Sequence, residues 1–133
     1  MRYMILIYND LTALEGMSEE EEQKDYQAYM AFNEKAIEQG AMNDALPLHP
    51  YTSATTVRVK DGKTTTFDGP FAETKEVLGG VYVLDCENLD KAIELAAMIP
   101  AAKYGSVEIR PVLEIPDVND SHSFQSTSLP LRK

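Results

Sequence analysis

The sequence has little of what disulfide-bonded, membrane-spanning and metal-binding proteins require. Its single cysteine, Cys86, cannot form an internal disulfide, which fits a reducing compartment. The apolar run at the N-terminus ends at Asn9 and Asp10, too early for a signal peptide or a membrane span. The 2 histidines, His49 and His122, lie far apart without cysteines or paired carboxylates at ligand spacing. We therefore expect a cytoplasmic protein without a metal or other cofactor.

Basic residues are also scarce. The chain has 12 lysines and arginines against 22 aspartates and glutamates, which gives a formal charge of −10 and a pI near 4.5. Because such a chain repels phosphate backbones and its basic residues are scattered singly, we expect no binding to nucleic acid. What the chain does have is apolar content, 44% of 133 residues, which is enough for the core of one domain.

Alternation of side chains predicts the strands. Residues 2–8 (RYMILIY) and 79–86 (GGVYVLDC) are apolar on both alternating faces, which is typical of strands covered on both sides. Residues 106–115 (SVEIRPVLEI) are expected to form the last strand. The clearest local signal lies over 54–67, where ATTVRVK and KTTTF flank Asp61-Gly62. This pattern predicts a β-hairpin with a two-residue type I′ turn.

Two helices are predicted between these strands. Ser18 and Glu21 form a capping box, and the first helix is expected to run from there to about Gln39. Asn88 is expected to cap the second helix, which Pro100 should end. The inward stripe of the first helix is predicted to be Tyr26, Tyr29, Met30, Asn33, Ala36 and Ile37.

The resulting order is β-α-β-β-β-α-β, an α+β fold close to a ferredoxin-like βαββαβ with an extra hairpin strand. Two helices can cover only one face of such a sheet, although both long strands are apolar on both faces. The simplest cover for the other face is a second copy of the sheet, so we predict a homodimer. Residues 1–115 are expected to form the domain. Residues 116–133 are expected to be a mobile tail or an arm packed on the partner subunit.

Residues 67–84 (FDGPFAETKEVLGGVYVL) concentrate ionisable side chains just before an apolar strand. A regular hairpin register places Asp68 opposite Thr55 and on the same face as Val57 and Val59. A carboxylate on this more apolar face would be partly desolvated, which is one ingredient of an acid–base residue. The alternative is architectural: Asp68 would accept backbone N–H bonds and fix the turn at residues 69–70.

The rest of this segment also allows two interpretations. Phe71 is expected to plug the core or the dimer interface, or else to form an aromatic wall for a ligand. Glu73 would share a face with Glu76 on a helical turn, or with Lys75 in an extended chain, where the two form a surface ion pair. The glycines at 79–80 predict a β-bulge or a close approach of backbone.

The stretch DGPFAETKE (68–76) resembles the DGPF group of YCII-related proteins. The resemblance extends over roughly residues 1–115 and includes TTVRVKDGK (55–63), LGGVYVLDC (78–86), LDKAIELAAMIP (89–100) and YGSVEIRPV (104–112). It implies a ferredoxin-like dimeric α+β barrel, in agreement with the order of the elements and with the expected homodimer.

The resemblance implies less about function. The wider YCII group is associated with a His-Asp pair, and one branch includes a dehydrochlorinase of a chlorinated hydroxyhydroquinone. In this chain the corresponding positions fall near Tyr29 and at Ile99, so chemistry that needs a histidine base requires Asp68, Glu73 or Tyr29 in its place. DGPF proteins are also similar to proteins encoded beside extracytoplasmic-function sigma factors, which implies a regulatory setting.

Three hypotheses follow. The first is a small-molecule site between helix, hairpin and dimer partner, with acid–base chemistry on a small phenolic or acid metabolite. Its catalytic carboxylates would be Asp68 and Glu73, and its lining would include Phe71, Tyr29, His49 and Arg58. The second is a non-catalytic regulatory dimer that binds a protein such as a sigma factor, which an acidic surface and the tail would favour. The third is a purely architectural motif.

Overall fold

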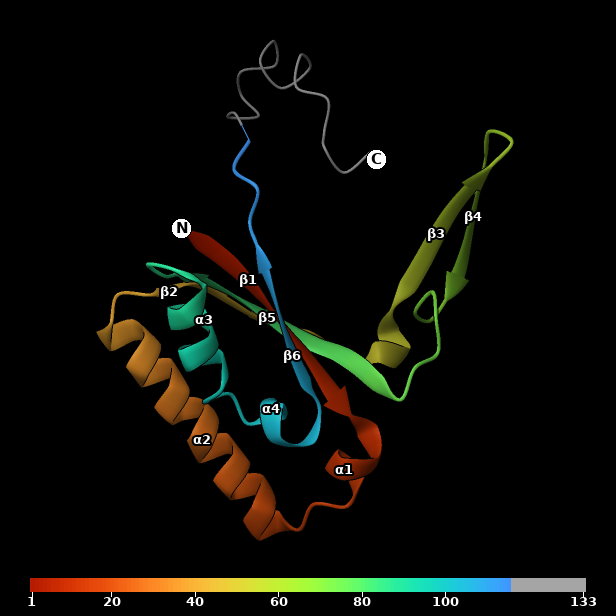
Figure 1. The fold of residues 1–133 in the computed structure, drawn as a ribbon. Helices are drawn as coiled ribbons and strands as arrows, with labels where there is room; N and C mark the ends of the chain where they lie inside the picture. Colours follow the sequence, from red (N-terminus) through yellow and green to blue (C-terminus); the bar gives the residue numbers. More distant parts are fainter. Residues whose placement is uncertain (116–133) are drawn as a thin grey trace.

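The computed structural model describes residues 1–115, so the expected tail over 116–133 lies outside the described residues. A four-stranded antiparallel sheet has the strand order β2-β5-β1-β6, and a separate two-stranded hairpin pairs β3 with β4 (Figure 1). The strands are β1 (Arg2–Asp10), β2 (Met42–Pro47), β3 (Thr55–Lys60), β4 (Lys63–Asp68), β5 (Glu76–Asp85) and β6 (Ser106–Pro111). This α+β arrangement is compatible with the predicted ferredoxin-like fold.

The helices gather on one face of the four-stranded sheet (Figure 1). They are α1 (Leu11–Glu15), α2 (Glu19–Glu38), α3 (Leu89–Ala96) and α4 (Ala101–Tyr104), whereas the 3₁₀ helix η1 (Tyr51–Ser53) lies apart from them at the foot of the hairpin. The predicted capping box opens α2: the Ser18 hydroxyl accepts the Glu21 backbone N–H at 3.1 Å, and the Glu21 carboxylate accepts that of Ser18 at 3.3 Å. Within the described part of the chain, no helix has the length and apolar character needed to cross a membrane.

The two faces of the sheet differ sharply in exposure. On the face toward the helices, Tyr3, Ile5 and their neighbours across the strands are buried in the core. On the opposite face, Leu6 is half-buried and Met4 is 36% exposed, because no element of residues 1–115 packs over them. We call this the open face. The dimer expected to cover it stays a prediction.

The helix α2 packs through part of the predicted stripe, namely Ala36 with the half-buried Tyr29 and Asn33, and also through Phe32, which lies outside that stripe. Phe32 is fully buried, and its ring lies edge-on to Tyr82 with centroids 4.9 Å apart. Ala36 is buried as predicted, but Tyr26 and Ile37 are both exposed. The helix is therefore rotated toward Phe32. This residue provides the largest apolar surface that the sheet can bury at that point.

The second predicted helix is shorter than expected, and a further short helix follows it. It ends at Ala96, and Pro100 stands at the start of α4 rather than at the end of a long helix. Proline is tolerated there because the first turn of a helix needs no N–H donor from it. The last strand is also shorter than expected, since β6 ends at Pro111.

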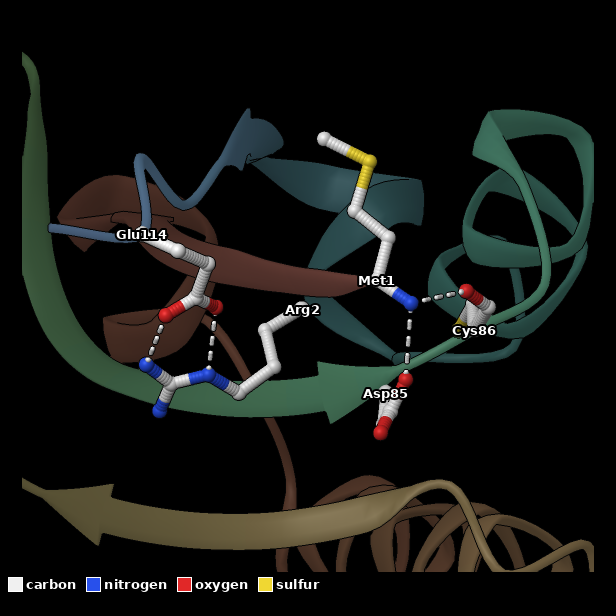
Figure 2. A network of polar contacts seen from close by, with 5 residues as sticks. All are labelled: Met1, Arg2, Asp85, Cys86 and Glu114. Atoms are coloured by element: carbon white, nitrogen blue, oxygen red, sulfur yellow. Dashed lines mark hydrogen bonds and ion pairs between the residues drawn. The ribbon is translucent and has the colours of Figure 1, made fainter.

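Both ends of the domain are joined at one edge of the core (Figure 2). The amino group of Met1 donates to the Asp85 carboxylate at 3.0 Å and to the Cys86 carbonyl at 3.1 Å. Beside it, the Arg2 guanidinium donates twice to the Glu114 carboxylate, each time at 2.8 Å. The hydrogen bond from Arg2 lowers the pKa of Glu114. These contacts hold the start of β1 against the chain that follows β6.

The hairpin confirms the predicted register and turn. Thr55 faces Asp68 and Lys60 faces Lys63, and the positive φ angles of Asp61 (52°) and Gly62 (76°) fit a type I′ turn. The hairpin extends away from the four-stranded sheet (Figure 1). Consequently Val57 is 59% exposed, and nothing in residues 1–115 desolvates that face of the hairpin.

We predict that Gly105→Ala destabilises the fold by about 1–3 kcal/mol. A Cβ at this position would collide with the backbone carbonyl oxygen of Tyr8 and lie 3.3 Å from that of Ala101, so either β1 or α4 must shift. Gly16→Ala is the control, because its Cβ would have ordinary contacts of 3.5 Å or more. Urea unfolding curves measure both variants, and equal midpoints for the two would contradict the prediction.

Candidate functional site

Two hollows formed by residues 1–115 lie on opposite sides of the four-stranded sheet. The first lies between α2 and strands β2 and β5 and has a volume of about 430 Å³; we call it the α2 hollow. The second lies where the hairpin leaves the sheet and has a volume of about 500 Å³; we call it the hairpin-foot hollow. Both volumes fall within the usual range of small-molecule sites.

Small residues on β2 and β5 create the space beneath α2. The pairing of β1 with β5 shifts after Ile7, which leaves Gly79 as the extra residue of the predicted bulge. The Asn9 amide nitrogen lies where a Cβ on Gly79 would stand, and a Cβ on Gly80 would be 3.2 Å from the Leu46 carbonyl oxygen. Both positions therefore need glycine for the close approach of neighbouring groups. The remaining lining is Tyr26, Tyr29, Met30, Asn33, Ala45, Pro47, Val81 and Tyr82.

The polar groups of the α2 hollow are all neutral. The Tyr82 hydroxyl donates to the Asn33 side-chain oxygen at 3.0 Å, which leaves the Asn33 amide group as a free donor. Asn9 supplies a second amide from the opposite side. Of the described residues, no Lys, Arg, His, Asp or Glu lines this space. The hollow can therefore offer a ligand hydrogen bonds from neutral groups and contact with apolar walls.

Three tyrosines lie near Asn33, of which Tyr82 is buried and Tyr29 and Tyr104 are half-buried. The Tyr104 hydroxyl donates to the Asp25 carboxylate at 3.1 Å, from α4 to α2. Burial raises the pKa of Tyr82 to about 12, with a smaller contribution from Tyr29. Burial, followed by the charge of Asp25, likewise raises the pKa of Tyr29, and burial raises that of Tyr104. Phenols are protonated at neutral pH in any case, and the raised pKa values keep these three protonated, and thus able to donate hydrogen bonds, to a higher pH than an ordinary tyrosine.

The hairpin-foot hollow is built by three segments that meet at the ends of β1 and β5. Tyr8 and Leu78 pair across the sheet on the open face. The chain after β2 is held against β5 by a hydrogen bond from the Leu48 N–H to the Gly79 carbonyl at 3.0 Å. The loop after β4 closes the third side and presents Phe71, which is 76% exposed.

The predicted ligand-binding residues do not converge on one site. Tyr29 lines the α2 hollow, whereas His49 and Phe71 line the hairpin-foot hollow. Arg58 is exposed on β3, where it faces Thr65 and lines neither hollow. Ile99, the position that corresponds to the aspartate of the family pattern, is fully buried.

Asp68 and Glu73 also lie outside both hollows, and both are exposed. The expected desolvation of Asp68 is wrong for the single chain, because the hairpin stands away from the sheet. The expected anchoring role is wrong as well: among residues 1–115 the Asp68 carboxylate accepts no hydrogen bond. Two other hydrogen bonds hold the turn. The Gly69 N–H donates to the Ala54 carbonyl at 2.6 Å, and the Thr56 hydroxyl donates to the Gly69 carbonyl at 2.7 Å.

The sequence-based search missed the groups that give the α2 hollow its polarity. Tyr82 was assigned only to an apolar strand, and Asn9 only to the end of an apolar run. Asn33 did carry a usable signal, since it was an amide on a stripe predicted to face inward, and buried amides need hydrogen-bond partners.

Comparison with known proteins places the chain among relatives of its own size. The family model described as the YCII-related domain matches residues 1–116. An uncharacterised protein of Rhizobium meliloti (strain 1021) is 40% identical over 114 residues, which cover 84% of this chain and 92% of that protein. Neither match specifies a substrate or a partner.

We predict that stability falls between pH 10 and pH 12. In this range an unfolded tyrosine with the ordinary pKa of 10 loses its proton, whereas Tyr82, with a pKa of about 12, keeps it. The unfolded state is thereby favoured by up to about 2 kcal/mol, and below pH 10 the stability contributed by this group is fully present. Urea unfolding at several pH values measures the loss. Tyr82→Phe should lose less over this range, and an equal loss in both proteins would contradict the assignment.

Proposed function

This chain belongs to the YCII-related family, and on that premise we propose that it binds a small phenolic metabolite in the α2 hollow. The observation that carries the proposal is the chemistry of the lining: apolar and aromatic walls with neutral amide and hydroxyl groups. The finer placement in the DGPF group stays a prediction.

Because no charged side chain of residues 1–115 lines the α2 hollow, the hollow favours neutral ligands over charged ones. A carboxylic acid would lose its hydration on entering and would meet no cationic side chain from residues 1–115. A phenol loses less, because its hydroxyl can accept from the free Asn33 amide and its ring can pack against Tyr26 and Met30. Of the two metabolite classes expected from the sequence, the lining therefore favours the phenol.

Acid–base catalysis by Asp68 and Glu73 is a separate part of this proposal. Neither carboxylate lines a hollow of its own chain, so a second copy would have to bring them to the ligand. Both carboxylates are exposed, and the support for such a role is that a ligand held by the second copy could reach them.

We propose that the second copy covers the open face and forms the homodimer expected from the sequence. Support comes from the row of apolar side chains left there, in which Leu6 pairs with Val81 and Met4 pairs with Val83. A sheet with one solvated face normally alternates apolar with polar residues, and these strands do not. A protein partner such as a sigma factor remains the alternative, and the acidic first turn of α2 at 19–22 is the surface that it would use.

The ligand proposal predicts that catechol binds the α2 hollow and that benzoate binds at least about tenfold more weakly, since the acid finds no cation there. Two-dimensional ¹H–¹⁵N NMR titrations locate and measure binding. Ala45→Leu, which fills the hollow from β2, should abolish the shifts, and Asn33→Ala should weaken binding about fivefold to tenfold through the lost hydrogen bond.

Two control variants distinguish binding in the α2 hollow from any role of the Asp68 carboxylate. Gln27→Ala lies on the exposed side of α2 and should leave binding unchanged. Asp68→Asn should fold and bind like the wild type if the carboxylate acts only in catalysis. The proposal fails if catechol produces no shifts around the α2 hollow or if Ala45→Leu binds it as well as the wild type.

The dimer proposal predicts that Leu6→Lys, at the centre of the open face, converts a dimer into a monomer without loss of secondary structure. A buried lysine without a partner opposes packing of the two sheets. Sedimentation equilibrium measures the mass, and circular dichroism checks the fold. Gln27→Lys adds the same charge on the outer side of α2 and should stay dimeric. A monomeric wild type would refute the proposal.

A further inference from the structure

We propose that the hairpin-foot hollow binds a small organic cation with an apolar or aromatic body. Aromatic rings would hold the cation on the open-face side of the sheet, and the carboxylate of Glu76 would neutralise it. This site is separate from the α2 hollow and does not depend on the function proposed there.

The first observation is the concentration of aromatic rings at the foot of the hairpin. Tyr8 comes from β1, Tyr51 from η1, and Phe71 from the loop after β4, and all three line the same space together with His49. Tyr51 and Phe71 are exposed, although large aromatic side chains are usually buried. The faces of Phe and Tyr rings attract cations within about 6 Å. Three such rings around one hollow suit an ammonium group.

The second observation is the charge of Glu76. This residue is half-buried and lines the hollow. Across the sheet it pairs with Asp10, but the neighbouring Lys75 forms its ion pair with Asp10 at 3.7 Å. The Thr74 hydroxyl donates to the backbone carbonyl of Glu76 at 2.6 Å rather than to its carboxylate. Within residues 1–115, the carboxylate therefore has neither a hydrogen bond nor an ion pair.

A carboxylate without a partner in a hollow with apolar walls favours a cationic ligand, because a cation would both neutralise its charge and contact the aromatic rings. No Lys or Arg of the described chain lines the hollow to supply that cation, and the net charge of −10 attracts positive ligands from solution. The remaining walls, which include Leu48, Pro50 and Val77, are apolar. A bare metal ion does not fit, since Glu76 is the one carboxylate of the lining and metal ions of the Ca²⁺ type require several oxygen ligands.

The test uses three probes of one size and different charge: phenethylammonium, 2-phenylethanol and phenylacetate. Each is titrated into the full-length protein and followed by ¹H–¹⁵N NMR. We expect phenethylammonium to shift the amides of the hairpin foot and to bind about tenfold more tightly than the neutral alcohol. Phenylacetate should bind more weakly than either. Equal binding of the amine and the alcohol, or shifts located elsewhere, would overturn the proposal.

Variants separate the carboxylate from the rings. Glu76→Gln should reduce the preference for the amine over the alcohol to about twofold or less, while binding of the alcohol persists. Phe71→Ala should weaken both probes. Glu87→Gln, which removes one exposed charge outside the hollow, is the matched control and should behave as the wild type.

The competing occupant is a side chain of a second copy. Sedimentation of Phe71→Ala distinguishes the two, because a ligand pocket predicts an unchanged mass with weakened amine binding. If the variant instead dissociates and the wild type does not bind the amine, Phe71 belongs to a dimer interface and the proposal is overturned.

Discussion

The structure depends on a single constraint of packing: its helices cover one face of a four-stranded sheet and leave the other uncovered. On the covered face, Phe32 of α2 meets Tyr82 of β5, and the core forms around this contact. On the open face, side chains of the same strands such as Leu6 have no neighbours from residues 1–115 above them. Successive residues of a strand point to opposite faces of the sheet, so each strand contributes side chains both to the buried core and to the open face.

The bulge at Gly79 links the two hollows to this sheet. On the covered side, Gly79 and Gly80 leave the space beneath α2. On the open side, the Gly79 carbonyl accepts the Leu48 N–H and thereby fixes the chain that forms the hairpin-foot hollow. A change in the backbone here would alter both spaces together, since one irregular residue sets the path of the strand on either side.

The two hollows differ in chemistry although they share this backbone. Among residues 1–115, no charged side chain lines the α2 hollow, and burial raises the pKa of Tyr29 and Tyr82 further above neutral pH. The family resemblance implies a histidine near Tyr29, where this chain has a phenol. The hairpin-foot hollow instead combines aromatic rings with the carboxylate of Glu76. The hollow with neutral polar groups and the hollow with a carboxylate therefore lie on opposite sides of the sheet.

Local sequence patterns were enough to specify the hairpin register around Asp61-Gly62, the capping box at Ser18 and the bulge at Gly79. Each depends on residues within a few positions of one another, and backbone sterics and short hydrogen bonds suffice to specify it. Tertiary structure alone decided that Phe32 turns inward and that Tyr29 is separated from His49 and Phe71. It also left Asp68 exposed. The physical reason is that burial and proximity arise from packing between elements distant in sequence, which no local pattern encodes.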